Sequence, residues 1–169
     1  MSGEFYRLYV APALPPLLIV LGWFFVSRDN DRRETRKEIR ALINEYSKKL
    51  DAHLERVVEY FSKVDNIKSP TKAQLAEVSI KQGFDRLESS LRLIQQMDPR
   101  YRSVDTFFDD LANLVTGHSK FESRTFEGKL SPVDFDLMDM ALKSKTLIDE
   151  LEGVFVKTQI RRGCLVDPE

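Results

Sequence analysis

An uncharged apolar run near the start of the chain, residues 8–26, constrains the fold more than any other feature. It reads LYVAPALPPLLIVLGWFFV. A helix that crosses the roughly 30 Å hydrocarbon core of a bilayer needs about 20 mainly apolar residues, and an amphipathic ring such as that of Trp23 favours the membrane interface. A cleaved signal peptide fits less well, because Val26 leads into Ser-Arg-Asp-Asn and no small-residue cleavage site is seen. The run predicts an uncleaved membrane anchor within residues 1–27.

Prolines divide this run and leave its structure open. A proline lacks the amide proton that an interior helix position donates. If the regular helix begins only at Pro15 or Pro16, the stretch from Leu17 to Val26 is about 15 Å long and enters a bilayer without crossing it. A kinked membrane-spanning helix and a half-inserted segment are therefore alternatives. The residues assigned to the anchor and its interaction with membrane lipid include Leu8, Pro12, Pro15, Pro16, Trp23 and Val26.

Basic residues flank the run unequally on its two sides. Arg7 precedes it, whereas the stretch from Arg28 to Arg40 contains six lysines and arginines. Positive residues beside a span favour the cytoplasmic side, and acidic residues count little in this rule. We therefore expect a single-pass protein of a cell or inner membrane, with its N-terminus outside and its C-terminal domain in the cytoplasm.

The remaining chain has the length of one helical domain. Residues 28–163 are sufficient to bury a core, and residues 164–169 are expected to form a flexible tail. Charged residues make up 31% of the chain and the net charge is −1. Such a balance gives no nucleic-acid footprint. The single cysteine, Cys164, excludes an intrachain disulfide.

Helical periodicity continues through this domain. Residues 29–66 contain no glycine or proline, and their apolar residues recur every three or four positions. Ser69-Pro70, Asp98-Pro99 and Ser131-Pro132 each place a capping residue before a proline, a pattern typical of helix starts. The chain is therefore predicted to be all-α, with the anchor followed by a cytoplasmic antiparallel bundle of about four helices.

The apolar stripes predict which helix faces are buried. The stripe of the second helix consists of Leu75, Val78, Ile80, Phe84, Leu87, Leu91, Ile94 and Met97. That of the last helix consists of Phe135, Met138, Leu142, Leu147, Ile148, Leu151, Val154 and Phe155. Gly83 lies inside the second helix, where close helix packing is the simplest explanation for it.

The first cytoplasmic helix also resembles one strand of a coiled coil. Its seam consists of Ile39, Ile43, Tyr46, Leu50, His53, Val57, Phe61 and Val64. Steps of four and three residues approach the 3.5-residue repeat of a coiled coil, although a bundle helix has a similar pattern. We therefore predict a homo-oligomer in which the part around Arg32–Tyr46 is free to pair.

The loop after the third helix, residues 118–130, mixes aromatic and basic side chains. Phe121, Arg124 and Phe126 are candidates for contact with a partner. Alternatively, the two phenylalanines return to the core, because an apolar ring is more often buried than presented to a partner.

Known catalytic and cofactor motifs are absent from the sequence. It has no phosphate-binding glycine loop, no Cys-x-x-Cys and no His-Glu-x-x-His. Neither His53 nor His118 follows a glutamate by three residues, as a carboxylate-bridged metal site in a bundle requires. His53 adjoins the apolar stripe and is interpreted as a boundary histidine, with a phosphotransfer role as the alternative. No catalytic residue, cofactor or metal is predicted.

These features favour a membrane-tethered, non-catalytic adaptor or regulatory protein that recruits an unidentified protein partner through its cytoplasmic bundle. Catalysis needs converging polar groups in a pocket, and the sequence shows no such group. Two alternatives remain, namely an enzyme or phosphotransfer module with an unrecognised site, and a membrane-damaging protein of the lysis type.

Overall fold

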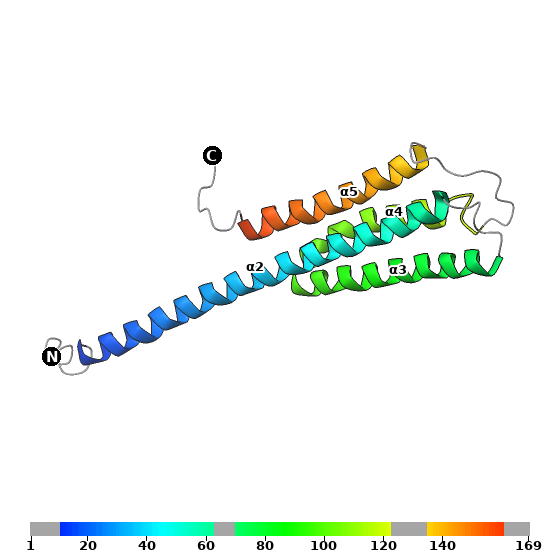
Figure 1. The fold of residues 1–169 in the computed structure, drawn as a ribbon. Coiled ribbons are helices and arrows are strands. Elements are labelled where there is room, and N and C mark those ends of the chain that lie inside the picture. The colour runs from blue at the N-terminus through cyan, green and yellow to red at the C-terminus, as the bar shows by residue number, and fades with distance from the viewer. Residues whose placement is uncertain (1–10, 63–69, 123–134, 161–169) are drawn as a thin grey trace, which may run out of the picture. The chain divides into compact units, whose positions relative to one another are not determined.

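The computed structural model describes residues 11–62, 70–122 and 135–160, and in these ranges the protein is all-helical (Figure 1). The helices are α2 (Ala11–Ser62), α3 (Pro70–Met97), α4 (Asp105–Thr116) and α5 (Phe135–Phe155). The 3₁₀ helix η3 (Pro99–Val104) precedes α4, and the π-helical turn η4 (Val156–Ile160) follows α5. The chain divides into two compact units, residues 1–38 and residues 39–169.

The described part of the first unit is the N-terminal portion of α2. This helix begins at Ala11, so Pro15 and Pro16 lie inside it and neither proline starts it. The side chains of residues 17–21 and 23–26 are exposed, from 45% at Leu21 to 78% at Trp23. No helix in the described ranges is long and apolar enough to cross a membrane. Leu8 lies outside these ranges, and the side chain of Pro12 is not described.

The second unit is a helical bundle, as predicted. Helices α3 and α5 run antiparallel to α2 and α4 (Figure 1). Two hydrogen bonds fix the antiparallel alignment of α2 with α3: Lys49 Nζ donates to Ser90 Oγ at 3.2 Å, and Tyr60 Oη donates to Glu77 Oε1 at 3.0 Å. A salt bridge from Arg40 to Glu152 connects α2 to α5.

Each helix of the bundle buries a seam whose residues alternate in steps of three and four. The seam of α2 is Ile39, Ile43, Tyr46, Leu50, His53, Val57 and Tyr60. That of α3 is Glu77, Ile80, Phe84, Leu87, Leu91, Ile94 and, just beyond the helix, Asp98. That of η3 and α4 is Tyr101, Val104, Phe108, Leu111 and Val115. That of α5 and η4 is Leu137, Met140, Ser144, Leu147, Leu151, Val154 and Thr158. This spacing is the one that packs helices in four-helix bundles.

The predicted stripes of the second and last helices are partly wrong. Leu75 and Val78 at one end of α3 are 65% and 50% exposed, and Met97 at the other end is 37% exposed. In α5, Met138 and Leu142 are 59% and 62% exposed. The physical reason is that polar residues occupy some of the buried seam positions. A buried face predicted from hydrophobicity alone therefore omits those positions and includes apolar residues that lie beside the seam.

The helix boundaries agree with several predicted signals. Asp98 caps η3, because its Oδ1 accepts the Arg100 backbone N–H at 3.1 Å, and Pro99 takes the first helical position. The Arg100 guanidinium also donates to both oxygens of Asp98. Gly117 ends α4 and donates its N–H to Asn113 O at 2.8 Å. The predicted start at Ser131-Pro132 lies outside the described residues.

Tyr46 provides a test of this core. Its side chain is 1% exposed, and its hydroxyl has no hydrogen-bond partner among the described residues. Burial raises the pKa of Tyr46 above its usual range. A buried unpaired hydroxyl costs about 1–3 kcal/mol, so we expect Tyr46→Phe to leave the free energy of unfolding unchanged or to increase it by about 1 kcal/mol. Urea unfolding of the full chain in mild detergent measures this.

The control for Tyr46→Phe is Tyr60→Phe, which removes the hydroxyl that donates to buried Glu77. That control is expected to be destabilised by about 1–3 kcal/mol, because the buried Glu77 carboxylate loses the hydrogen bond that the Tyr60 hydroxyl donates. If Tyr46→Phe lowered the free energy of unfolding more than Tyr60→Phe does, the Tyr46 hydroxyl would be shown to be hydrogen-bonded.

Candidate functional site

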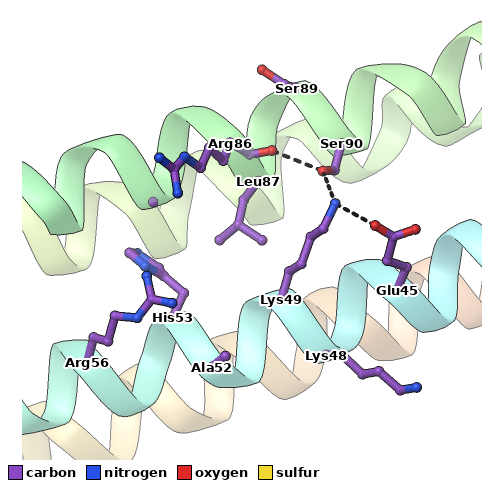
Figure 2. Close-up of a pocket in the computed structure, with 11 residues that line it drawn as sticks. Glu45, Lys48, Lys49, Ala52, His53, Arg56, Arg86, Leu87, Ser89 and Ser90 are labelled. Atoms are coloured by element: carbon purple, nitrogen blue, oxygen red, sulfur yellow. Dashed lines mark hydrogen bonds and ion pairs between the residues drawn. The ribbon is translucent and has the colours of Figure 1, made fainter.

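A groove of about 560 Å³ lies between α2 and α3 (Figure 2). Its α2 wall is formed by Glu45, Lys48, Lys49, Ala52, His53 and Arg56. Its α3 wall is formed by Gly83, Arg86, Leu87, Ser89 and Ser90. The seam packing holds both helices in register, so these side chains come from two rigid elements rather than from loops.

His53 is a buried residue of this groove. Its side chain belongs to the α2 seam and is 2% exposed, so it is more deeply buried than the boundary position predicted from the sequence. Its ring meets the Phe84 ring edge-on, with 4.5 Å between centroids. It also fills the space above Gly83, where a Cβ would lie 2.2 Å from both His53 Cε1 and Nδ1. Gly83 is therefore required by close packing of the two helices, as the sequence predicted.

The His53 imidazole is held in its neutral form. Neither ring nitrogen has a hydrogen-bond partner among the described residues. Burial, and next the positive charge of Arg56, lower the pKa of His53 to about 4. The ring is therefore neutral near pH 7.

Cations dominate the rim of the groove. Lys49 forms a salt bridge with Glu45 at 2.8 Å, and this hydrogen-bonded contact lowers the pKa of Glu45. Lys48, Arg56 and Arg86 have no ion-pair partner in the described part of the chain. Four cations and one carboxylate line the groove, so positive charge is in excess by three.

The Ser90 hydroxyl links the two walls. It accepts the Lys49 ammonium at 3.2 Å and donates to the Arg86 backbone oxygen at 3.0 Å. Figure 2 shows this chain of contacts at one end of the groove and the side chains of Arg56 and Arg86 near His53 at the other. Two of the three unpaired cations, Arg56 and Arg86, therefore lie at the second end.

Of the three predicted partner-contact residues, only Phe121 is described. Its ring is 6% exposed and packs against Tyr60, with 5.6 Å between centroids. Lys81 Nζ lies 5.9 Å from the centroid of the same ring. Phe121 thus returns to the core, which is the interpretation that the sequence favoured for this ring. Arg124 and Phe126 lie outside the described residues.

His118 forms a separate polar contact beside the core. Its Nδ1 accepts the Lys120 backbone N–H at 3.1 Å, which leaves Nε2 to donate to Asp136 Oδ2, also at 3.1 Å. This pair connects the turn after α4 to the start of α5. Among the described residues, no group of three or more histidine, cysteine, aspartate or glutamate side chains is arranged to hold a metal ion.

Part of the segment predicted to pair with another copy is buried in the chain's own bundle. Ile39, Ile43 and Tyr46 are at most 1% exposed in the single chain, and they belong to its own core. These three side chains are therefore not available for pairing, whereas residues 32–38 belong to the first unit. Homo-oligomer formation stays a prediction.

Comparison with known proteins gives no matching family model, no matching curated protein and no matching solved structure.

The groove is the feature that sequence reasoning missed. The available signals were Lys49 and Arg56, spaced seven residues apart beside the α2 seam, and Gly83 within a long helix.

Proposed function

We propose that this protein is a membrane-tethered, non-catalytic adaptor whose first unit inserts into lipid and whose helical bundle binds a protein partner in the cytoplasm. One observation carries the proposal: the apolar side chains of residues 17–21 and 23–26 are all exposed, between 45% and 78%. A contiguous exposed apolar surface marks contact with a membrane or another protein. An uncharged run on a helix favours lipid.

The length of the inserted segment distinguishes two forms of this proposal. Residues 15–26 extend about 18 Å as a helix, which is less than the roughly 30 Å of a hydrocarbon core. Residues 8–26 would extend about 28 Å by the same rise. Insertion of the longer segment gives a span with Pro15 and Pro16 inside it, and insertion of the shorter one gives a half-inserted helix. The basic residues that follow favour a cytoplasmic bundle in either form.

Exposed apolar residues on the bundle support the adaptor role. Met138 and Leu142 of α5 are four positions apart and are 59% and 62% exposed. Residues at this spacing lie on one face of a helix. Such a pair provides an anchor for a protein partner, because interface cores are formed by buried apolar side chains.

Flotation with lipid vesicles tests the tether. We expect the full chain to float with the vesicles and the Leu21→Asp/Phe25→Asp variant to lose at least tenfold in its membrane-bound fraction. An aspartate at the centre of an inserted helix costs about 2.5–3.5 kcal/mol. The control is Leu93→Asp, which places an aspartate at a 52% exposed position of α3.

Equal flotation of the double variant and the Leu93→Asp control would contradict insertion of this segment. The two forms of the proposal are separated by a tag at the N-terminus. Protease added outside sealed vesicles that contain the bundle in their lumen cuts the tag only if the segment crosses the bilayer.

A further inference from the structure

We propose that the groove between α2 and α3 is a binding site for the phosphate group of a small molecule, held chiefly by Arg56 and Arg86. This site is distinct from the exposed apolar run of the first unit. The inference therefore stands whether or not that unit enters a membrane.

The arrangement of charge is the first support. Arg56 comes from α2 and Arg86 from α3, and both side chains lie near His53 (Figure 2). Neither guanidinium has an ion-pair partner in the described ranges. Like charges that share a groove repel each other. An anion bound between the two guanidiniums is attracted to both of them, and these attractions outweigh the repulsion. An anionic ligand is therefore complementary to the charge of the groove.

The donors match a phosphate group in particular. A guanidinium presents a planar fork of N–H groups that bonds two phosphate oxygens, and a lysine adds a point charge. The Lys48 side chain points away from this end of the groove in Figure 2, so Arg56 and Arg86 carry the contact. A phosphate monoester carries a charge of about −1.5 to −2 at pH 7, which the two guanidinium charges offset.

The groove has room for more than an inorganic ion. Its volume of about 560 Å³ lies within the usual range for small-molecule sites. Ala52 and Leu87 add apolar surface to the walls. We therefore infer a phosphate carried by an organic group, with the phosphate at the Arg56–Arg86 end and the organic group toward Lys49.

His53 is the second, independent support. It lines the groove, it is 2% exposed, and both of its ring nitrogens lack a partner among the described residues. Arg56 contributes to the low pKa of this imidazole. A phosphate bound at Arg56 opposes that positive charge, so binding must raise the pKa of His53. The histidine is thus a reporter within the site that does not depend on any activity.

Titration with pyrophosphate and with a short-chain, water-soluble phosphatidic acid tests the proposal on the full chain in mild detergent. Calorimetry is expected to show saturable binding, and Arg56→Gln/Arg86→Gln is expected to weaken it at least tenfold. The matched control, Arg92→Gln/Arg102→Gln, removes the same number of exposed charges elsewhere and is expected to bind as the wild type does. Circular dichroism verifies that each variant is folded.

The His53 ring signals, followed by NMR as the pH falls, give a second measurement. Saturating ligand is expected to move the midpoint upward from about 4 in the wild type and in the control variant. Arg-dependent binding of pyrophosphate assigns the site to soluble phosphates, and Arg-dependent binding of phosphatidic acid alone assigns it to a lipid headgroup. Binding that is equal in the two double variants, or an unchanged His53 midpoint at saturation, would overturn the proposal.

Discussion

Replacing Gly83 by alanine is expected to destabilise the bundle by about 2 kcal/mol or more. Alanine favours a helix interior over glycine by about 1 kcal/mol, so propensity alone predicts the opposite sign. The steric effect is larger because the new Cβ would lie 2.2 Å from two atoms of the His53 ring. That ring is 2% exposed and packs edge-on against Phe84, so moving it aside would break this contact and disturb the core. Overpacking of a core by one methyl group costs about 1–3 kcal/mol.

A double-mutant cycle with His53→Ala isolates this contact. Once the imidazole is removed, Gly83→Ala is expected to be neutral or stabilising, because only helix propensity remains. Gly153→Ala in α5 is the matched control, since a Cβ there meets nothing within 4 Å. That control is expected to stabilise by up to about 1 kcal/mol. If urea unfolding finds Gly83→Ala as stable as Gly153→Ala, the fit of His53 against α3 is wrong.

Acidification is expected to destabilise the bundle through His53. Its folded-state pKa is about 4, and its unfolded-state pKa is near 6.5. The unfolded chain therefore binds a proton more readily than the folded one. The contribution of neutral His53 to the free energy of unfolding is complete above pH 6.5, falls as the pH decreases, and is lost by about pH 4. Arg56 on α2 and Arg86 on α3 line the groove with His53, and both are positively charged. Glu45 is the one carboxylate among the described residues that line the groove, so little negative charge is present to stabilise a protonated His53.

The size of this loss is roughly 3 kcal/mol, as one pKa unit corresponds to about 1.4 kcal/mol. Urea unfolding between pH 7.5 and pH 4 measures it against His53→Gln, which retains a polar side chain that does not titrate. Carboxylates contribute equally to both proteins, so the difference between the two curves reports His53. We expect that difference to change by about 3 kcal/mol across the range. Parallel curves would show that His53 is already protonated or exposed in the folded protein.

The all-helical fold and several helix ends were predictable because they depend on local signals. The start of α3 at Pro70, the Asp98 cap and the Gly117 stop follow from the chemistry of single residues and their neighbours. The α2 seam was also readable, since its three- and four-residue steps continue through His53. Periodicity alone could not tell that this seam faces the chain's own bundle, because a bundle helix and a coiled-coil strand share the pattern.

The seam of α5 shows why hydrophobicity misplaced another face. Met138 and Leu142 are strongly apolar but exposed, while Ser144, two positions after Leu142, is buried. The Ser144 hydroxyl donates to the Ala141 backbone oxygen at 3.0 Å. A serine satisfied in this way enters the core at little cost. The position of a face is therefore set by the contacts of the whole seam and not by the most hydrophobic residues.

The groove could not be predicted because it depends on the register of two helices. Arg56 and Arg86 are thirty positions apart in sequence, and each alone looks like an ordinary solvated cation. Their proximity follows from the placement of His53 over Gly83, which aligns α2 with α3. Local spacing carries information about one helix face but not about the offset between two helices.

The polar members of the seams have a consequence for how the bundle finds one alignment. A repeating three-four pattern of apolar residues would permit α3 to slide along α2 by seven residues and still bury most of its apolar side chains. Such a slip would separate Glu77 from Tyr60 and would place a bulkier residue than Gly83 opposite His53. Each shifted alignment would thus lose the hydrogen bond between Tyr60 and Glu77 and also introduce a steric clash at His53. These two contacts therefore disfavour shifted alignments of α2 and α3 during folding. Hydrophobic burial alone would permit several offsets between the helices, and the two contacts select one of them.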